Sequence, residues 1–124
     1  MFMIKTQKEN KPIISIDYDG TYTLNPSAMD DAIRVLLDNG FEVICCTMRY
    51  KEDGEELMDS IGKLCDVYFT GRKSKYHYLL KEYSLTPNIW MDDMPYWVHF
   101  NAADYTRYDR HPLTRGLVKK GEGI

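Results

Sequence analysis

The stretch that decides the fold is Pro12-Ile13-Ile14-Ser15-Ile16, followed directly by Asp17-Tyr18-Asp19-Gly20-Thr21. The first five residues form a short apolar run, which is typical of a buried strand. The strand is expected to end at Asp17, where two carboxylates two positions apart enter a glycine turn. If the extended geometry persists through Asp19, both carboxylates lie on the same side of the chain.

The rest of the chain alternates short β-branched or aromatic runs with amphipathic stretches. Asn25 before Pro26 is typical of a helix start and Gly40 of a helix end. Residues 96–100 fit a short helix or a short strand. The alternation predicts an α/β fold built from βαβ units with a parallel sheet. Further strands are predicted at 41–46, 67–69 and 88–91, and further helices at 55–64 and 74–83.

The 124 residues are enough for one domain, with a core over about 12–100 and a C-terminal extension over 101–124. A composition with 44% apolar and 28% charged residues is that of a globular protein. Apolar runs are too short for a membrane span or a secretory signal, so we expect a cytoplasmic protein without membrane contact. The spacing of Cys45, Cys46 and Cys65 suggests neither a disulfide framework nor a zinc site.

Polar residues recur at the predicted strand ends, where open parallel sheets bind ligands. A carboxylate such as Asp17 can attack phosphorus to give an aspartyl phosphate. A second carboxyl group, here Asp19, can protonate the leaving oxygen and later activate water. Thr47 and Arg49 follow the second strand and can hold phosphoryl oxygens.

Basic residues follow the third predicted strand, and an acidic pair follows the fourth. Arg72, Lys73 and Lys75 precede the third long helix, where an ammonium group can neutralise charge on a transferring phosphoryl group. Asp92 and Asp93, with the carboxylate after the first strand, can hold a hard cation through oxygen ligands. Each signal alone also fits an ordinary turn or a solvated loop. Together, at four consecutive strand ends, they indicate a phosphoryl site.

In this order, Asp-x-Asp-Gly-Thr, Thr, Lys and an acidic pair, the sequence resembles the haloacid dehalogenase (HAD) superfamily over about residues 12–98. The resemblance implies a HAD-like, Rossmann-like three-layer sandwich with a mainly parallel central sheet. It also implies a phosphatase that hydrolyses phosphomonoesters through an aspartyl-phosphate intermediate. Asp17 would be the nucleophile, Asp19 the general acid and base, and Thr47 a phosphoryl-binding residue.

The resemblance implies further residues around the phosphoryl group. Its phosphate-binding lysine is Lys75, at the helix start, or the neighbouring Lys73. Its Mg²⁺ ligands are Asp17, the backbone carbonyl of Asp19, and one of Asp92 and Asp93, with the other nearby or bound through water. The metal bridges the nucleophile and the phosphate and offsets the repulsion between two anions. The candidate substrate-binding residues are Gly20, Thr21, Arg49 and Lys73.

Short connections predict that the protein has no cap domain. In this superfamily caps lie between the first and second motifs or between the second and third. Here residues 21–41 have room for one helix, and residues 47–73 for one helix and one strand. The expected open site suits a polynucleotide end or a phosphoprotein, or a small phosphorylated molecule covered by another subunit of a homo-oligomer.

Other functions stay open from the sequence. A receiver domain, which is a regulatory module, also uses aspartates, Thr, Lys and magnesium, but its acidic pair comes first along the chain. A catalytically silent relative would act as a phosphate-binding module, and a phosphotransferase would share the same motifs. The net charge of −3 argues against binding nucleic acid by bulk electrostatics. The C-terminal extension nevertheless interleaves aromatic and basic residues that could contact nucleic acid: Tyr105, Arg107, Tyr108, Arg110, His111, Arg115, Lys119 and Lys120.

Overall fold

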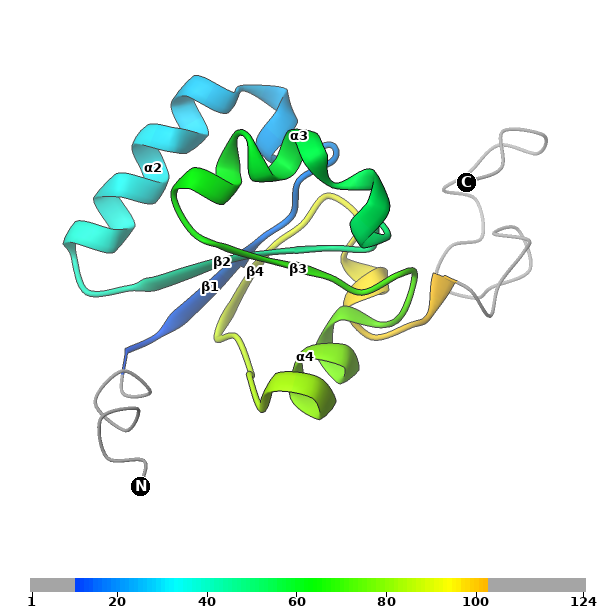
Figure 1. Cartoon of the computed structure of the whole chain (residues 1–124). Coiled ribbons are helices and arrows are strands. Elements are labelled where there is room, and N and C mark those ends of the chain that lie inside the picture. Colours follow the sequence, from blue (N-terminus) through cyan, green and yellow to red (C-terminus); the bar gives the residue numbers. More distant parts are fainter. Residues whose placement is uncertain (1–10, 103–124) are drawn as a thin grey trace.

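A four-stranded parallel sheet forms the centre of the protein in a computed structural model that describes residues 11–102. The strands lie in the order β3-β2-β1-β4, so β1 has a neighbour on each side (Figure 1). The chain passes from β1 to β2 and β3 on one side and then returns to β4 on the other. The strands are β1 (Ile13–Ile16), β2 (Glu42–Thr47), β3 (Asp66–Phe69) and β4 (Ile89–Met91).

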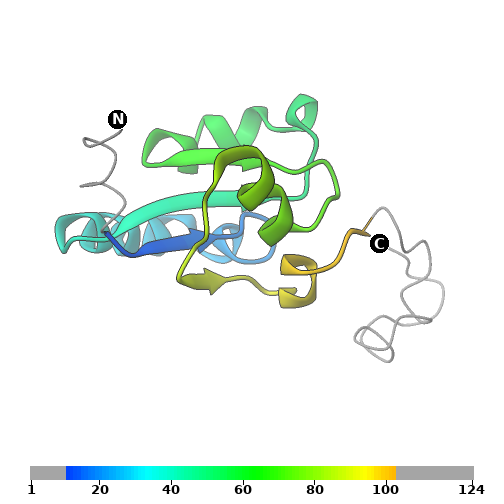
Figure 2. The same ribbon diagram turned by 90° about the horizontal axis from the view of Figure 1, so that it is seen from below.

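Helices cover both faces of the sheet, as Figures 1 and 2 show. On one face, α2 (Pro26–Asp38) and α3 (Glu55–Met58) bury Ile33 and Leu57 against β1 and β2. On the other face, α4 (Lys75–Tyr83) buries Leu79 against the same two strands. Successive strand residues point to opposite faces, so β1 and β2 contribute side chains to the hydrophobic clusters on both faces. The predicted α/β fold with a parallel sheet is confirmed, and the arrangement is compatible with a Rossmann-like fold.

The predicted strands and two of the predicted helices are confirmed to within about two residues. For α2, the side chain of Asn25 accepts a hydrogen bond from the backbone N–H of Ala28 at 3.1 Å, and Pro26 occupies the first turn. The remaining elements are short 3₁₀ helices: η1 (Tyr22–Leu24), η2 (Lys51–Asp53), η3 (Ile61–Lys63) and η4 (Pro95–Val98). Residues 96–100, for which the sequence left helix and strand open, thus begin within a short helix.

The single helix predicted over 55–64 is wrong, because α3 ends at Met58 and η3 follows it. The hydroxyl of Ser60 donates to the carbonyl of Glu56 at 2.7 Å, which takes the acceptor that an unbroken helix would offer to the N–H of Ser60. Gly62, a poor helix former, follows two residues later. Local side-chain competition therefore divides a segment whose apolar spacing is helical.

Of the predicted extension over 101–124, only Asn101 and Ala102 belong to the described residues. The aromatic and basic residues from Tyr105 to Lys120 lie outside them. No helix within residues 11–102 is long and apolar enough to cross a membrane.

Candidate active site

The carboxyl ends of β1 and β4 meet where the strand order reverses, and Asp17 lies at that point. Its backbone N–H donates to the carbonyl of Met91 at 2.9 Å, so the pairing of the two strands continues to the first residue after β1. The residue is only 8% exposed. Ligands of doubly wound sheets bind at such a reversal. The fold therefore places a nearly buried carboxylate where a ligand is expected.

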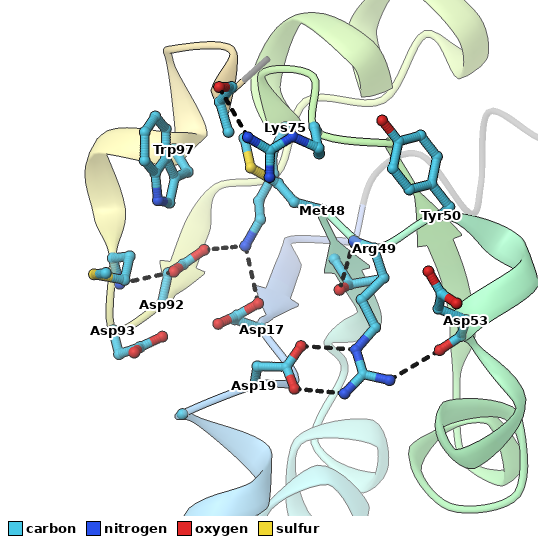
Figure 3. Close-up of a pocket in the computed structure, with 15 residues that line it drawn as sticks. Asp17, Asp19, Met48, Arg49, Tyr50, Asp53, Lys75, Asp92, Asp93 and Trp97 are labelled. Atoms are coloured by element: carbon cyan, nitrogen blue, oxygen red, sulfur yellow. Dashed lines mark hydrogen bonds and ion pairs between the residues drawn. The ribbon is translucent and has the colours of Figure 1, made fainter. Parts of the chain in front are cut away.

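The ammonium group of Lys75 binds two carboxylates at this point. Its Nζ donates to Oδ1 of Asp17 at 3.0 Å and also to Oδ2 of Asp92, as Figure 3 shows. Lys75 is the first residue of α4, and 2% of its surface is exposed. Lys73 is exposed and does not line the cavity around Asp17. Of the two candidate lysines, the fold therefore brings Lys75 to Asp17.

A third carboxylate, that of Asp93, lies beside the two that bind Lys75. Oxygens of Asp17, Asp92 and Asp93 lie within 4.8 Å of one another. The pKa of Asp17 is raised to about 7, first by burial and then by the carboxylates of Asp92 and Asp93, against the opposing effect of Lys75. Burial lowers the pKa of Lys75, but the charges of Asp17 and Asp92 outweigh it, so the net pKa is raised. Both shifts are consistent with an excess of negative charge in the cluster.

The cluster fits a divalent cation by its donor chemistry. Its three carboxylates supply oxygen ligands, which Mg²⁺ prefers over nitrogen or sulfur. A divalent cation would also balance the negative charge that Lys75 leaves uncompensated. The residues expected from the sequence to hold magnesium through their side chains, Asp17, Asp92 and Asp93, are thus the ones that the fold gathers.

The turn after β1 holds Asp93 in place. The hydroxyl of Thr21 donates to Oδ1 of Asp93 at 3.3 Å and accepts the backbone N–H of Asp93 at 3.2 Å. Gly20 has a φ of +79°, and a Cβ there would overlap the Asp93 carboxylate. Only glycine satisfies both conditions without strain. Gly20 and Thr21, expected to contact substrate, therefore shape the acidic cluster in this structure.

Asp19 forms an ion pair with Arg49, which lies just after β2. Nε and Nη2 of the guanidinium donate to the two carboxylate oxygens of Asp19 at 2.9 and 2.7 Å. Nη1 donates to the backbone carbonyl of Asp53 at 2.9 Å, and Nη2 also contacts the carboxylate of Glu56 at 3.3 Å. The guanidinium stacks over the ring of Tyr18 with its centre 5.3 Å from the ring centroid. Arg49 thus orients Asp19 here, and its expected contact with the phosphoryl group stays a prediction.

Thr47 is the last residue of β2, and only 1% of its surface is exposed. Its side-chain oxygen accepts the backbone N–H of Arg49 at 3.2 Å, which orders the turn after the strand. It lines the same cavity as Asp17. A hydroxyl at this place can donate to a phosphoryl oxygen.

A cavity of about 620 Å³ opens above these residues. Most of the residues singled out from the sequence line it, whereas Thr21 and Lys73 do not. Arg72, which the sequence placed in the basic cluster before α4, also lines it. The sequence did not single out the remaining lining residues: Met48, Tyr50, Asp53, Met94, Trp97 and Ala102.

Some of these additional residues carry a signal that could have identified them. Met48 and Tyr50 lie within three residues after β2, and Arg72 lies three residues after β3. Because loops at the carboxyl ends of parallel strands converge, these residues are expected near the site. Trp97 and Ala102 lie after β4, where the sequence pattern is weak. Their place depends on how η4 folds back over the sheet, which no local pattern indicates.

No family model, curated protein or solved structure matches this chain. What the site can do is therefore argued from its own residues and geometry.

Proposed function

We propose that this protein is a magnesium-dependent phosphomonoester hydrolase of the HAD type, with Asp17 as its nucleophile. The observation that carries the proposal is the cluster of Asp17, Asp92 and Asp93 at the junction of β1 and β4, two of whose carboxylates, Asp17 and Asp92, bind the ammonium of Lys75. A carboxylate held by a lysine and facing a cavity is suited to attack on a phosphoryl group. The same lysine and a bound Mg²⁺ would neutralise the charge of that group.

The residues that would hold Mg²⁺ are Asp17, one or both of Asp92 and Asp93, and the backbone carbonyl of Asp19. When bound, the metal would neutralise charge on the nucleophile and the phosphoryl oxygens. Lys75 and Thr47 would contact the remaining phosphoryl oxygens from the sides of the cavity. This division of roles is supported by the positions of all these residues around one cavity.

Two displacements at phosphorus make up the proposed reaction. In the first, an oxygen of Asp17 bonds to phosphorus while the ester P–O bond breaks, and the carboxyl group of Asp19 gives its proton to the leaving oxygen. In the second, Asp19 takes a proton from a water molecule, which displaces phosphate from Asp17. Acid and base roles for one carboxyl group require a defined position. The two bonds from Arg49 to Asp19 fix that position, but they engage both carboxylate oxygens, so one of them must open when Asp19 carries the proton.

An open, capless site belongs to the same proposal. Between β1 and α2 the chain forms only η1, and between β2 and β3 it forms η2, α3 and η3. The shortness of these segments supports the proposal that no cap domain is inserted there. Such a site would admit a large phosphorylated substrate, including a polynucleotide end, as well as a small one.

The test is phosphate release from p-nitrophenyl phosphate and from 3′- and 5′-phosphorylated oligonucleotides, with and without Mg²⁺. We expect wild-type turnover to need the metal and to stop on chelation. Asp17→Asn keeps the shape but removes the nucleophilic charge, and should reduce turnover by at least about 1,000-fold. Asp38→Asn is the matched control, because Asp38 ends α2 shortly before the start of β2, away from the carboxyl ends of the strands, and should keep wild-type turnover.

Turnover that survives Asp17→Asn would contradict the proposed nucleophile. A second outcome would point to a different class of protein. If acetyl phosphate labels Asp17 stably and phosphate is not released, the protein is a regulatory phospho-accepting module and not a hydrolase.

A further inference from the structure

Arg72 lies in the cavity without a role in the proposed chemistry. It lines the same cavity as Asp17 and is partly buried. Nη2 of its guanidinium donates to the backbone carbonyl of Ala102 at 3.2 Å, and its backbone N–H donates to the carbonyl of Met48 at 2.8 Å. Both ends of the residue are therefore held in place beside the site.

The charge of Arg72 distinguishes it from the other cations of the cavity. Arg49 pairs with Asp19 and Glu56, and Lys75 pairs with two aspartates. Within residues 11–102, Arg72 forms no ion pair with a carboxylate. Its only side-chain hydrogen bond there goes to a neutral carbonyl. A guanidinium has five N–H donors, so most of them remain for an anionic ligand.

The backbone of Arg72 adopts a conformation that is unfavourable for a side chain of this kind. Its φ is +72°, in the left-handed region that normally favours glycine. The turn keeps this conformation through the bond from Arg72 to Met48 and a second one from the N–H of Gly71 to the carbonyl of Arg49, 3.2 Å long. Backbone strain that is retained beside a cavity is characteristic of functional positions.

We propose that Arg72 binds a second anionic group of the substrate. The preferred substrates are then phosphate monoesters whose leaving group carries a carboxylate or a further phosphate. This inference rests on the proposed function, because it assumes that the transferred phosphoryl group lies between Asp17 and Lys75. A cavity of about 620 Å³ leaves room for a leaving group beside that position. A guanidinium fork matches carboxylate and phosphate oxygens equally well, so it accepts either anion.

The test measures affinity with ligands whose C–P bonds cannot be hydrolysed. Propylphosphonate carries one anionic group, whereas 3-phosphonopropionate adds a carboxylate and propane-1,3-bisphosphonate adds a second phosphonate. Calorimetric titrations at fixed free Mg²⁺ and ionic strength give the dissociation constants. We expect wild type to bind at least one of the two bifunctional ligands about tenfold to 100-fold more tightly than propylphosphonate, as for hydrogen bonds to charged groups. The tighter of the two identifies the kind of anion.

Arg72→Gln is the decisive variant, because its amide can still donate to the carbonyl of Ala102 while the charge is lost. It should abolish the gain for the bifunctional ligands and leave the affinity for propylphosphonate unchanged, and Arg72→Lys should restore part of the gain. Arg34→Gln is the control, since Arg34 lies on the exposed face of α2 and pairs with Asp31.

Equal wild-type affinities for all three ligands would overturn the inference. An equal loss for all three ligands in Arg72→Gln would also overturn it, because Arg72 would then contact the transferred phosphoryl group itself. The two proposals fail separately. Hydrolysis without the affinity gain contradicts only the role of Arg72, and the affinity gain without hydrolysis contradicts only the proposed reaction.

Discussion

Gly20 and Gly40 form a matched pair for substitution, because they share a backbone conformation but differ in what surrounds them. Both have a positive φ, +79° and +92°, so a side chain at either position strains the backbone. A Cβ on Gly20 would also overlap the carboxylate of Asp93, whereas a Cβ on Gly40 would meet nothing within 4 Å. The comparison therefore separates the backbone cost from the effect on the acidic cluster.

We predict that Gly20→Ala and Gly40→Ala each lower the free energy of unfolding by roughly 1 kcal/mol, the cost of a left-handed conformation for alanine. Gly20→Ala should in addition weaken Mg²⁺ binding by about tenfold or more, as is usual when the support of a metal ligand is lost. Urea unfolding and calorimetric titration with Mg²⁺ measure the two effects. Equal Mg²⁺ affinities in both variants would show that Asp93 does not contribute to the cation site.

The sequence predicts the residues of the site better than their contacts. Asp17 can be located because an apolar strand ends there, and the same rule applies to Thr47 and to the acidic pair after β4. The choice between Lys73 and Lys75 depends on how the loop after β3 enters α4, since Lys75, the first residue of the helix, is buried at Asp17 whereas Lys73 is exposed. The ion pair between Arg49 and Asp19 joins side chains from the turns after two different strands, and no local pattern predicts such a contact.

At the scale of the elements, the start of α4 sets the position of Lys75. The side-chain oxygen of Ser74 accepts the N–H of His77 at 3.3 Å and donates to the carbonyl of Val98 at 2.8 Å. The backbone N–H of Ser74 donates to Oδ1 of Asn101 at 2.6 Å. One residue thus caps the helix and ties it to the segment that follows β4.

We predict that Ser74→Ala lowers the free energy of unfolding by about 1–2 kcal/mol, the usual cost of a lost N-cap. It should also lower kcat on p-nitrophenyl phosphate, because Lys75 is the next residue. Asn25→Ala removes the N-cap of α2 and should cost about 1 kcal/mol without changing kcat. Chemical unfolding and steady-state kinetics measure both variants. An unchanged kcat in Ser74→Ala would mean that Lys75 is positioned by its ion pairs alone.

The elements themselves could be predicted where capping and periodicity agree. Asn25, Pro26 and the apolar spacing after them all favour one helix, and α2 forms there. Over 55–64 the apolar spacing favours a helix, but Ser60 and Gly62 work against it locally. Tertiary contacts do not restore the helix, and the segment forms α3 and η3 instead.

At the scale of the whole molecule, the core should make the protein sensitive to alkali. Burial raises the pKa of Cys46 and of Cys65 from an ordinary 9.0 to about 12. Burial, followed by the bond to Asp30, raises the pKa of Tyr22 from 10.0 to about 12. Between pH 9 and 12 the folded protein therefore holds protons that the unfolded chain releases, so this contribution to stability is complete below pH 9 and is lost as pH rises.

We predict that the free energy of unfolding in urea decreases steadily from pH 9 to pH 10.5 and changes less between pH 7.5 and pH 9. Removing one of the responsible groups in Cys65→Ala should make the decrease shallower. A stability that stays constant up to pH 10.5 would show that these groups do not keep their protons in the folded state.

The parallel sheet follows from the alternation of strand and helix patterns along the chain, because parallel strands need crossover connections. The order of the strands does not follow from that alternation. It depends on β4 pairing with β1 and not with β3, a contact between segments more than seventy residues apart. The position of the site at the β1–β4 junction is for that reason a property of the completed fold.

The pairing of β4 with β1 also determines when the acidic cluster can exist. Asp17 directly follows β1, whereas Asp92 and Asp93 directly follow β4, the last strand within residues 11–102. A chain still being synthesised, or one cleaved before residue 92, contains Asp17, the proposed nucleophile, but lacks its acidic partners. A cation held by all three aspartates would bind only after the last strand has docked, and it would then resist separation of the first and last strands. The proposed magnesium-dependent activity would therefore begin only when folding is complete.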